Sequence, residues 1–232
     1  MSTTTEFALT DQQIRFYESF GFLKIPGLFA HDIERIEAAF EAVFAAEDTP
    51  FYLPSENEFH DTDDDAYAET LRQIIPGFLD KSPELSWLKD DPRVLGTVRS
   101  LLGDHIAYAE SDGNLFNCDV YWHTDLYGAD ASKENLKLFF YLDALHEDSG
   151  ALRVLPGTHH HQGIYGQTMR SDLYMPDKGT ELYGIDLQDF PSHTIDVEPG
   201  DLVVMNFRVL HGSWNGAPGR KLFTVNFTQA EA

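Results

Sequence analysis

The chain has 232 residues and a mass of 26.3 kDa, a length at which barrels and sandwiches commonly form a single domain. Its 42% hydrophobic residues and 17 glycines are those of a globular protein, which excludes disorder throughout the chain. Its 39 acidic and 16 basic residues leave a formal net charge of −23, and such a chain is expected to bind neither nucleic acid nor an anionic membrane.

Cys118 is the single cysteine of the sequence, which excludes an intrachain disulfide and a zinc site built on cysteines. The longest apolar runs, 42–46 and 138–142, are far shorter than the about 18 residues that a membrane-spanning helix needs. The opening residues lack the basic and apolar regions of a signal peptide. We therefore expect a cytoplasmic protein. The sequence does not fix the oligomeric state, and a monomer is slightly favoured.

The first predicted helix begins after a loose tail. Thr10, with Gln13 three residues later, has the spacing of a capping box that opens a short helix. Gly21 is placed to end that helix, because glycine readily adopts the left-handed conformation of a C-terminal cap. The stretch 22–25 then predicts a strand, which a Pro-Gly pair ends.

Two further helices are predicted before residue 104. Apolar residues at helical spacing indicate an amphipathic helix over roughly 31–46. The acidic, proline-containing stretch 47–70 favours a loop. Asp91 as N-cap, Pro92 at the first helical position and Gly103 after the last apolar residue delimit the third helix.

After about residue 104 the chain changes to short β-type runs separated by Gly, Pro, Asp and Asn, the pattern of an all-β sandwich or jelly roll. The interval 158–192 is long and mixed, so we expect a lid there. We predict one domain over 1–232, with a mostly helical part over 1–103 and a β core over 104–230. The β-type runs are 105–110, 114–122, 136–142, 151–155, 193–197, 201–207 and 220–228.

The strongest candidate for chemistry is His123-Thr124-Asp125. Side chains two residues apart on an extended chain point to the same face, so His123 and Asp125 can reach one metal ion together. His211, which follows the predicted strand 201–207, is the best candidate for a third ligand. Two histidines and one carboxylate leave open positions on an octahedral ion, which is the arrangement of non-haem Fe(II) oxygen chemistry.

The metal interpretation of His123 has to be compared with what the other histidines of the sequence indicate. A second His-x-acid match, at 146–148, lies in a run typical of an exposed turn, so the tripeptide alone is weak support. His123 follows two aromatic residues in a β-type run, where an unpaired polar pair is costly to bury, and this favours a metal over a core histidine. The adjacent histidines 159–161 cannot share one face of a strand, so we expect a solvated loop.

Arg220 begins the apolar strand 221–227, where its guanidinium can reach into the barrel. A buried guanidinium demands an anionic partner, and a carboxylate ligand would be bound through charge-assisted hydrogen bonds. Ser213, two residues after His211, can add a hydroxyl donor. The alternative, an ordinary ion pair with a surface acid, is common in a chain this acidic and is equally consistent with Arg220 alone.

Six segments of the sequence form a recognisable series, namely 16–27, 122–125, 140–145, 148–159, 198–206 and 211–220. In this order they resemble the phytanoyl-CoA dioxygenase (PhyH-like) family of Fe(II)/2-oxoglutarate-dependent oxygenases, and the resemblance covers about residues 10–228. It implies a mainly β fold: a double-stranded β-helix (a jelly roll, cupin-like) with flanking helices. Thr158 stands where the family usually has Ser, and this threonine retains the hydroxyl.

The resemblance also implies ligands and a reaction. It places iron on His123, Asp125 and His211, and the distal carboxylate of 2-oxoglutarate on Ser213 and Arg220. With O2, such a centre would hydroxylate an unactivated C–H bond of a small-molecule substrate and release succinate and CO2. Related halogenases have a small residue in place of the aspartate, so Asp125 indicates hydroxylation, desaturation or ring chemistry instead.

Three polar residues upstream of His123 are candidates for a hydrogen bond to 2-oxoglutarate, namely Tyr108, Asn114 and Asn117. Trp122 and Trp214 flank the predicted ligands and either line the pocket or pack in the core. Arg153 and Arg170 are the nearest basic candidates for an anionic substrate, although most arginines of an acidic chain pair at the surface.

Two other classes of function remain open on the sequence. A cupin-type metal enzyme that uses no 2-oxoglutarate would keep the iron ligands and have no need of Arg220. A catalytically silent β-sandwich binding module would keep the scaffold and bind no metal. The sequence carries no recognisable signature of a particular substrate.

Overall fold

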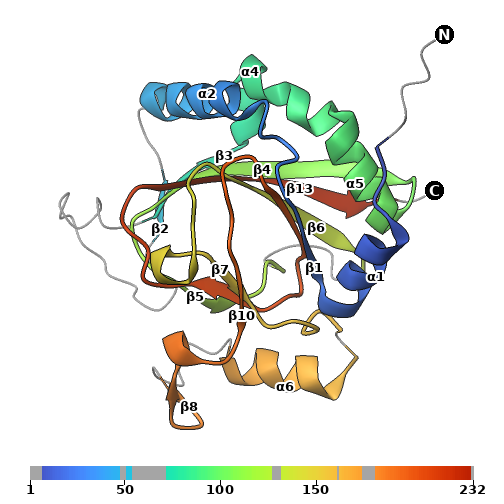
Figure 1. The fold of residues 1–232 in the computed structure, drawn as a ribbon, viewed down its shortest axis with the longest axis vertical. Helices are drawn as coiled ribbons and strands as arrows, with labels where there is room; N and C mark the ends of the chain where they lie inside the picture. The colour runs from blue at the N-terminus through green and yellow to red at the C-terminus, as the bar shows by residue number, and fades with distance from the viewer. Residues whose placement is uncertain are drawn as a thin grey trace.

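The computed structural model describes residues 7–47, 51–53, 72–126, 132–160, 162–173 and 181–230, without the side chains of 51–53 and 170–173. Two antiparallel sheets face each other, with helices outside them (Figure 1). The strands are β1 (Phe22–Ile25), β2 (Phe51–Leu53), β3 (Arg72–Pro76), β4 (Ile106–Phe116), β5 (Val120–His123), β6 (Asn135–Tyr141), β7 (Leu152–Val154), β8 (Glu181–Leu182), β9 (Ile185–Asp186), β10 (His193–Ile195), β11 (Leu202–Asn206), β12 (His211–Ser213) and β13 (Arg220–Gln229).

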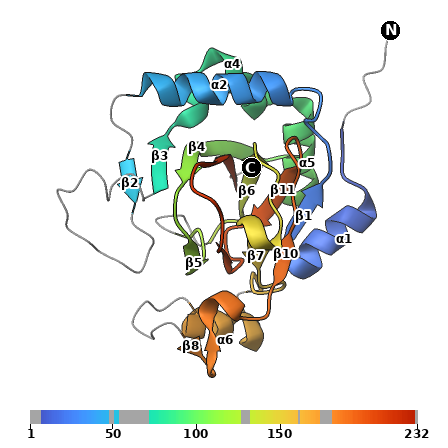
Figure 2. The same cartoon turned by 60° about the vertical axis from the view of Figure 1, so that its left-hand side comes forward.

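The larger sheet has seven strands in the order β1-β11-β6-β13-β4-β3-β2, and the smaller has four in the order β10-β7-β12-β5. Figure 2 shows the two sheets facing each other, with β4 and β6 on one side and β5 and β7 on the other. A short pair, β8 and β9, lies apart from both sheets. This arrangement is the jelly-roll core that the resemblance implies, and the predicted fold class is confirmed.

The helices are α1 (Asp11–Phe20), α2 (Ile33–Ala46), α4 (Pro83–Ser86), α5 (Pro92–Leu102) and α6 (Ile164–Leu173), with short 3-10 turns η1 (Phe78–Lys81), η2 (Trp87–Asp90), η3 (Glu147–Ser149) and η5 (Leu187–Asp189). Helices α2, α4 and α5 cover the outer face of the larger sheet, and α6 lies beyond the smaller one (Figure 1). None of the helices within the described ranges has the length and apolar character to cross a bilayer.

Capping explains the helix ends that the sequence predicts. In α1 the Gln13 amide donates to the Thr10 hydroxyl at 3.3 Å, and the Thr10 amide donates to the Gln13 side chain at 2.9 Å, so the capping box is confirmed. Gly21 ends the helix at φ 84°, and its amide donates to the Tyr17 carbonyl. In α5 the Asp91 carboxylate accepts from the Arg93 amide at 2.7 Å, as an N-cap does.

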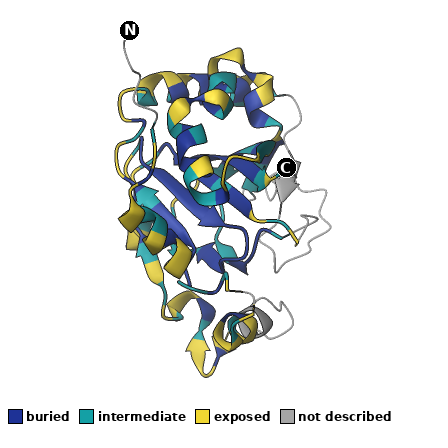
Figure 3. Cartoon of the chain, turned by 90° about the vertical axis from the view of Figure 1, so that its right-hand side faces the viewer, coloured by how far each residue is buried: buried dark blue, intermediate teal, exposed yellow. Residues whose placement is uncertain are grey.

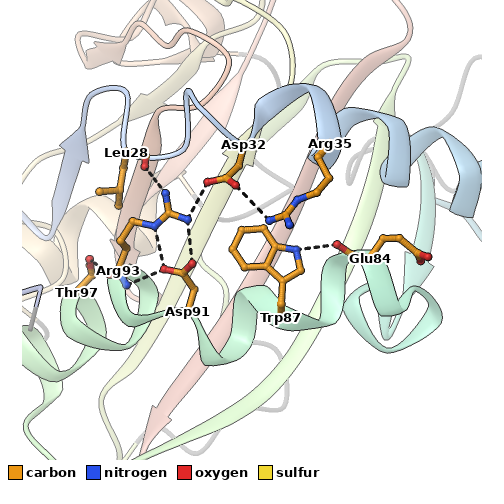
Figure 4. A network of polar contacts seen from close by, with 8 residues as sticks. All are labelled: Leu28, Asp32, Arg35, Glu84, Trp87, Asp91, Arg93 and Thr97. Carbon is orange, nitrogen blue, oxygen red and sulfur yellow. Dashed lines mark hydrogen bonds and ion pairs between the residues drawn. The ribbon is translucent and has the colours of Figure 1, made fainter. Parts of the chain in front are cut away.

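A polar network joins the helices on the outer face (Figure 4). The Arg93 guanidinium donates to both Asp32 and Asp91 at 2.9 Å, and to the Leu28 carbonyl at 2.9 Å. Arg35 also stacks over the Trp87 ring at 4.1 Å. These contacts fix the start of α2 against the start of α5, and both helices pack on the outer face of the larger sheet.

The apolar core forms separate layers, and Figure 3 shows the buried strands between exposed helix faces. Under the helices, Phe223 of β13 is fully buried and stacks on Phe140 at 4.6 Å between ring centroids. A second cluster fills part of the space between the sheets. A third cluster lies around Trp122 and Trp214, with Met169 of α6 packed against it.

Several predicted boundaries are wrong. The predicted runs 105–110 and 114–122 are instead one strand over 106–116 followed by β5, because β4 pairs with β13 without interruption from Glu110 to Phe116, Gly113 included. The predicted loop 47–70 includes β2, while its residues 48–50 and 54–70 lie outside the described part. The interval 158–192 contains α6, β8 and β9. The single domain, the division near residue 103 and the lid stay predictions.

Candidate metal centre and cosubstrate pocket

Two neighbouring strands bring the three predicted metal ligands together. His211 on β12 lies directly opposite His123 on β5, and the centroids of their rings are 4.0 Å apart. Asp125 follows β5, and its amide donates to the Phe207 carbonyl at 2.8 Å, which holds the turn in place. One donor atom from each of His123, Asp125 and His211 lies within 4.8 Å of the others.

Hydrogen bonds orient both imidazoles. His123 Nδ1 lies 2.8 Å from the Tyr121 carbonyl, and His211 Nδ1 lies 3.0 Å from the Val209 carbonyl. Each Nδ1 therefore carries the proton and donates it to a carbonyl oxygen, which leaves Nε2 as the ring nitrogen whose lone pair can bind a metal ion. His211 Nε2 lies 3.6 Å from Asp125 Oδ2.

Asp125 presents one oxygen that is held and one that has no partner. Lys137 Nζ donates to Oδ1 at 2.5 Å. Oδ2 is buried and finds no hydrogen-bond donor among the residues that the structure describes. Because an orphaned carboxylate oxygen is costly to bury, its position beside donor nitrogens of the two imidazoles fits a cation bound by all three.

Burial and neighbouring charges set the protonation that a metal ion requires. Burial, reinforced by the charge of His123, lowers the pKa of His211 to about 3, so its ring is neutral near pH 7. Burial alone would raise the pKa of Asp125, but the charge of Lys137, followed by those of His211 and His123, outweighs it and holds this pKa well below the usual range. A neutral imidazole and an ionised carboxylate are the forms that bind a divalent cation. The donor set thus fits ferrous iron.

The candidate ligands lie on the wall of a cavity of about 240 Å³ between the two sheets. Its wall also includes Arg220, Ser213 and Tyr141. Ser213 is on the same short strand as His211, and Tyr141 is opposite Leu222 of β13. Ser213 and Arg220 therefore share the cavity with the metal candidates, as the resemblance implies.

Arg220 is a buried guanidinium whose surroundings suit the binding of an anion. Its side chain is 6% exposed, and it donates to the carbonyls of Ala217 at 3.1 Å and Cys118 at 2.9 Å. No carboxylate of the described ranges forms an ion pair with it. A Cβ at Gly216 would overlap the guanidinium, so glycine at that position leaves room for it. The alternative of a surface ion pair does not describe this buried side chain.

Of the three upstream candidates for 2-oxoglutarate, the structure brings only Asn114 to the cavity wall. Asn114 Oδ1 accepts from Arg72 Nε at 2.9 Å. Tyr108 lies on the far side of the β4 bulge, which reverses the facing of the strand, and its hydroxyl lies 2.9 Å from that of Ser111. Asn117 accepts from the Gly219 amide at 2.8 Å and is not on the cavity wall.

The three substrate candidates also lie away from the cavity. Trp122 and Trp214 pack against each other at 4.9 Å in the third core cluster, and the Trp122 indole donates to the Leu187 carbonyl at 2.9 Å. Arg153 stacks over Trp214 at 5.1 Å and donates to Ser192 and to the carbonyls of Gln188 and Phe190. These residues hold the segment before β10 against the smaller sheet.

His146 and His160 lie at the exposed positions expected of them, whereas His159 is half-buried. His146 is exposed, 3.9 Å from Asp196 and 4.0 Å from Glu198. His159 and His160 lie 3.1 Å and 3.3 Å from the Glu18 and Ser19 carbonyls, respectively. His161 and the Arg170 side chain lie outside the described part.

The sequence interpretation missed several residues of the cavity wall. On β6, alternate residues Lys137, Phe139 and Tyr141 face the cavity, and on β13 Thr224 and Asn226 continue the face begun by Arg220. The available signal was the alternation itself, because polar residues two apart in an apolar strand share one face.

A family model confirms what the site indicates. The model of the phytanoyl-CoA dioxygenase (PhyH) family matches residues 17–216. The chain belongs to this family. It is therefore an enzyme of the Fe(II)- and 2-oxoglutarate-dependent oxygenases, whose cofactors are ferrous iron and 2-oxoglutarate. The sequence matches none of the curated proteins with which it was compared.

Several solved structures share the fold of this chain at low sequence identity. HygX from Streptomyces hygroscopicus, with nickel and 2-oxoglutarate bound, has a TM-score of 0.71 and 19% identity over 97% of this chain and 88% of that one. The α-ketoglutarate-dependent carbocyclase SnoK of nogalamycin biosynthesis has a TM-score of 0.70 and 19% identity over 100% and 88%. The epimerase SnoN of the same biosynthesis has a TM-score of 0.70 and 16% identity over 95% and 82%.

Proposed function

We propose that the chain hydroxylates an unactivated C–H bond of a small molecule, with 2-oxoglutarate and O2 consumed and succinate and CO2 released. One observation carries the proposal: the buried guanidinium of Arg220 lies in the same cavity as the His123, Asp125 and His211 donors. A cupin-type enzyme without 2-oxoglutarate would have no use for that guanidinium, and a silent binding module would have no use for the orphaned oxygen of Asp125.

Each part of the chain has a defined task in this proposal. His123, Asp125 and His211 would hold ferrous iron, which together with bound 2-oxoglutarate supplies the oxidising chemistry. Lys137 holds one oxygen of Asp125, so the other stays directed at the ion. Loss of a partner that orients a metal ligand typically costs about 10–100-fold in metal affinity or activity.

The other end of the cavity would hold 2-oxoglutarate. Arg220 would bind its distal carboxylate through paired N–H donors, with Ser213 adding a hydroxyl. Phe139 and Leu222 form apolar walls beside it and exclude water, which strengthens these polar contacts and protects reactive states from water. Asn114 is the upstream residue placed to add a further hydrogen bond.

Asp125 occupies the third ligand position, which leaves no room there for a halide, so hydroxylation is favoured over halogenation. The structural neighbours include a carbocyclase and an epimerase, so the reaction needs a direct test. HygX is also solved with hygromycin B bound, at 19% identity, a TM-score of 0.67 and coverage of 96% of this chain and 88% of that one, and we propose a small-molecule substrate here too. Three expectations stay predictions: that the chain acts in the cytoplasm, that it is a monomer, and that it binds no nucleic acid.

The test is a metabolite screen for substrate-stimulated succinate release, followed by mass spectrometry of the product. A product that gains one oxygen atom supports hydroxylation. A product that loses two hydrogen atoms places the enzyme with ring-forming or desaturating oxygenases, and an unchanged mass places it with epimerases; either result refutes hydroxylation. The His211→Ala variant should release no succinate, and the exposed variant Glu34→Gln on α2 serves as control.

A further inference from the structure

A row of polar side chains crosses the larger sheet on the cavity side, away from Arg220. Asn226 of β13 is paired with Lys137 of β6 on one side and with Glu110 of β4 on the other. One step along the same face, Thr224 is paired with Asp112. All five side chains line the cavity that holds the candidate metal centre. Strands β4 and β13 thus place two carboxylates, an amide and a hydroxyl on one wall.

Two of these side chains are buried, and each has one polar atom without a hydrogen-bond partner within the described ranges. Asn226 is 1% exposed and Thr224 is 4% exposed. Neither the Asn226 Oδ1 atom nor the Thr224 hydroxyl has a hydrogen-bond partner within the described ranges, whereas Asn226 Nδ2 lies 3.3 Å from Glu110 Oε1. One N–H of the amide is thus directed at Glu110, and the acceptor Oδ1 is left for a ligand. Buried polar atoms are ordinarily satisfied, so these two point to a ligand that brings hydrogen-bond donors.

The charge of this wall is negative. Lys137 forms an ion pair with Asp125, with 2.5 Å between Nζ and Oδ1. Over the described ranges, no lysine or arginine forms an ion pair with Glu110 or Asp112, although the charges of Lys137 and Arg72 act on Asp112 from further away. Asp112 is half-buried, and this burial raises the pKa of its carboxyl group. The net charge of −23 also attracts cations to the molecule as a whole.

We propose that Glu110, Asp112, Thr224 and Asn226 bind the substrate, and that this substrate carries an ammonium group next to hydroxyl groups, as amino sugars and other amino polyols do. The ammonium donates to the two carboxylates, and the hydroxyls donate to Asn226 Oδ1 and pair with Thr224. The inference rests on the proposed function, because it assigns the opposite end of the cavity to 2-oxoglutarate. An anionic or purely apolar substrate would leave these acceptors unpaired.

The experiment compares three hexoses that differ in charge, namely D-glucosamine, D-glucose and D-glucuronate, on protein loaded with Ni(II) and 2-oxoglutarate. Binding is measured by isothermal titration calorimetry, so the result does not depend on turnover. Glucosamine should bind about tenfold or more tightly than glucose, because its ammonium gains charge-assisted hydrogen bonds, and glucuronate should bind most weakly.

Isosteric variants tie this preference to the wall. In the double variant Glu110→Gln with Asp112→Asn, the ratio between glucosamine and glucose should fall to near one, while Glu34→Gln, which removes one exposed carboxylate outside the cavity lining, should leave it unchanged. Thr224→Val should weaken both sugars alike. The inference is overturned if glucose or glucuronate binds as tightly as glucosamine, if none binds measurably, or if the ratio survives in the double variant.

Binding of 2-oxoglutarate to the same samples separates the two proposals. If 2-oxoglutarate binds and the amine preference is absent, the substrate class is wrong and the proposed function stands. If 2-oxoglutarate does not bind, the proposed function fails and this inference falls with it.

Discussion

The Arg220→Ala variant should lose most of its affinity for 2-oxoglutarate and keep its affinity for the metal ion. The guanidinium is 6% exposed and spends two donors on the carbonyls of Ala217 and Cys118. A bidentate carboxylate would add two charge-assisted hydrogen bonds of about 1.5–3 kcal/mol each, or about 3–6 kcal/mol together. Since every 1.4 kcal/mol is tenfold, the dissociation constant should rise by at least about a hundredfold.

The assay is anaerobic calorimetry of 2-oxoglutarate binding to the Fe(II)-loaded protein, with Arg15→Ala on the exposed face of α1 as the matched control. A second variant, Gly216→Ala, keeps the charge but puts a methyl group where the guanidinium lies. It should displace Arg220 and weaken 2-oxoglutarate as well. If Arg220→Ala binds 2-oxoglutarate as the unaltered protein does, the cosubstrate lies elsewhere and the reasoning is refuted.

Three further predictions concern stability, each measured by urea unfolding. The metal-free protein should lose stability as the pH falls from 7 towards 4, by up to about 1.4 kcal/mol per pH unit for one group. The reason is that His211 of the unfolded chain takes up a proton at its ordinary pKa of 6.5, whereas the folded ring, with a pKa of about 3, does not. If the dependence of the unfolding free energy on pH is not reduced in His211→Asn, this prediction is contradicted. Phe223→Ala should cost about 3–5 kcal/mol through the cavity left beside Phe140, and a loss below about 1 kcal/mol would show that the core collapses around it. Thr10→Ala should cost about 1 kcal/mol, with Gln13→Ala costing less, and equal stability of all three proteins would deny the capping box a role.

Local signals in the sequence predicted much of the helical layer and its boundaries. A capping box and a left-handed glycine are satisfied within one helix, so Thr10 and Gly21 could be interpreted without knowing the fold. The strands that the sequence missed depend on distant partners. The short strand β3 exists because it pairs with β4, and no periodicity within five residues could indicate that pairing.

The same distinction divides the candidate site. His123 and Asp125 are two residues apart, and the period of a strand alone places them on one face. Lys137, Thr224 and Asp112 come from three strands far apart in the sequence, so only the register of the sheet shows that they face one another. Register depends on a bulge near Glu110 that the sequence does not announce, and Tyr108 was misplaced for that reason.

The most direct test of the whole account is the absorption spectrum of the anaerobic protein with Fe(II) and 2-oxoglutarate. If His123, Asp125 and His211 hold the iron within reach of Arg220, adding 2-oxoglutarate should produce a metal-to-ligand charge-transfer band, and Asp125→Ala should abolish it. A protein that binds Fe(II) and shows no band with 2-oxoglutarate, or that keeps the full band without Asp125, would contradict the account.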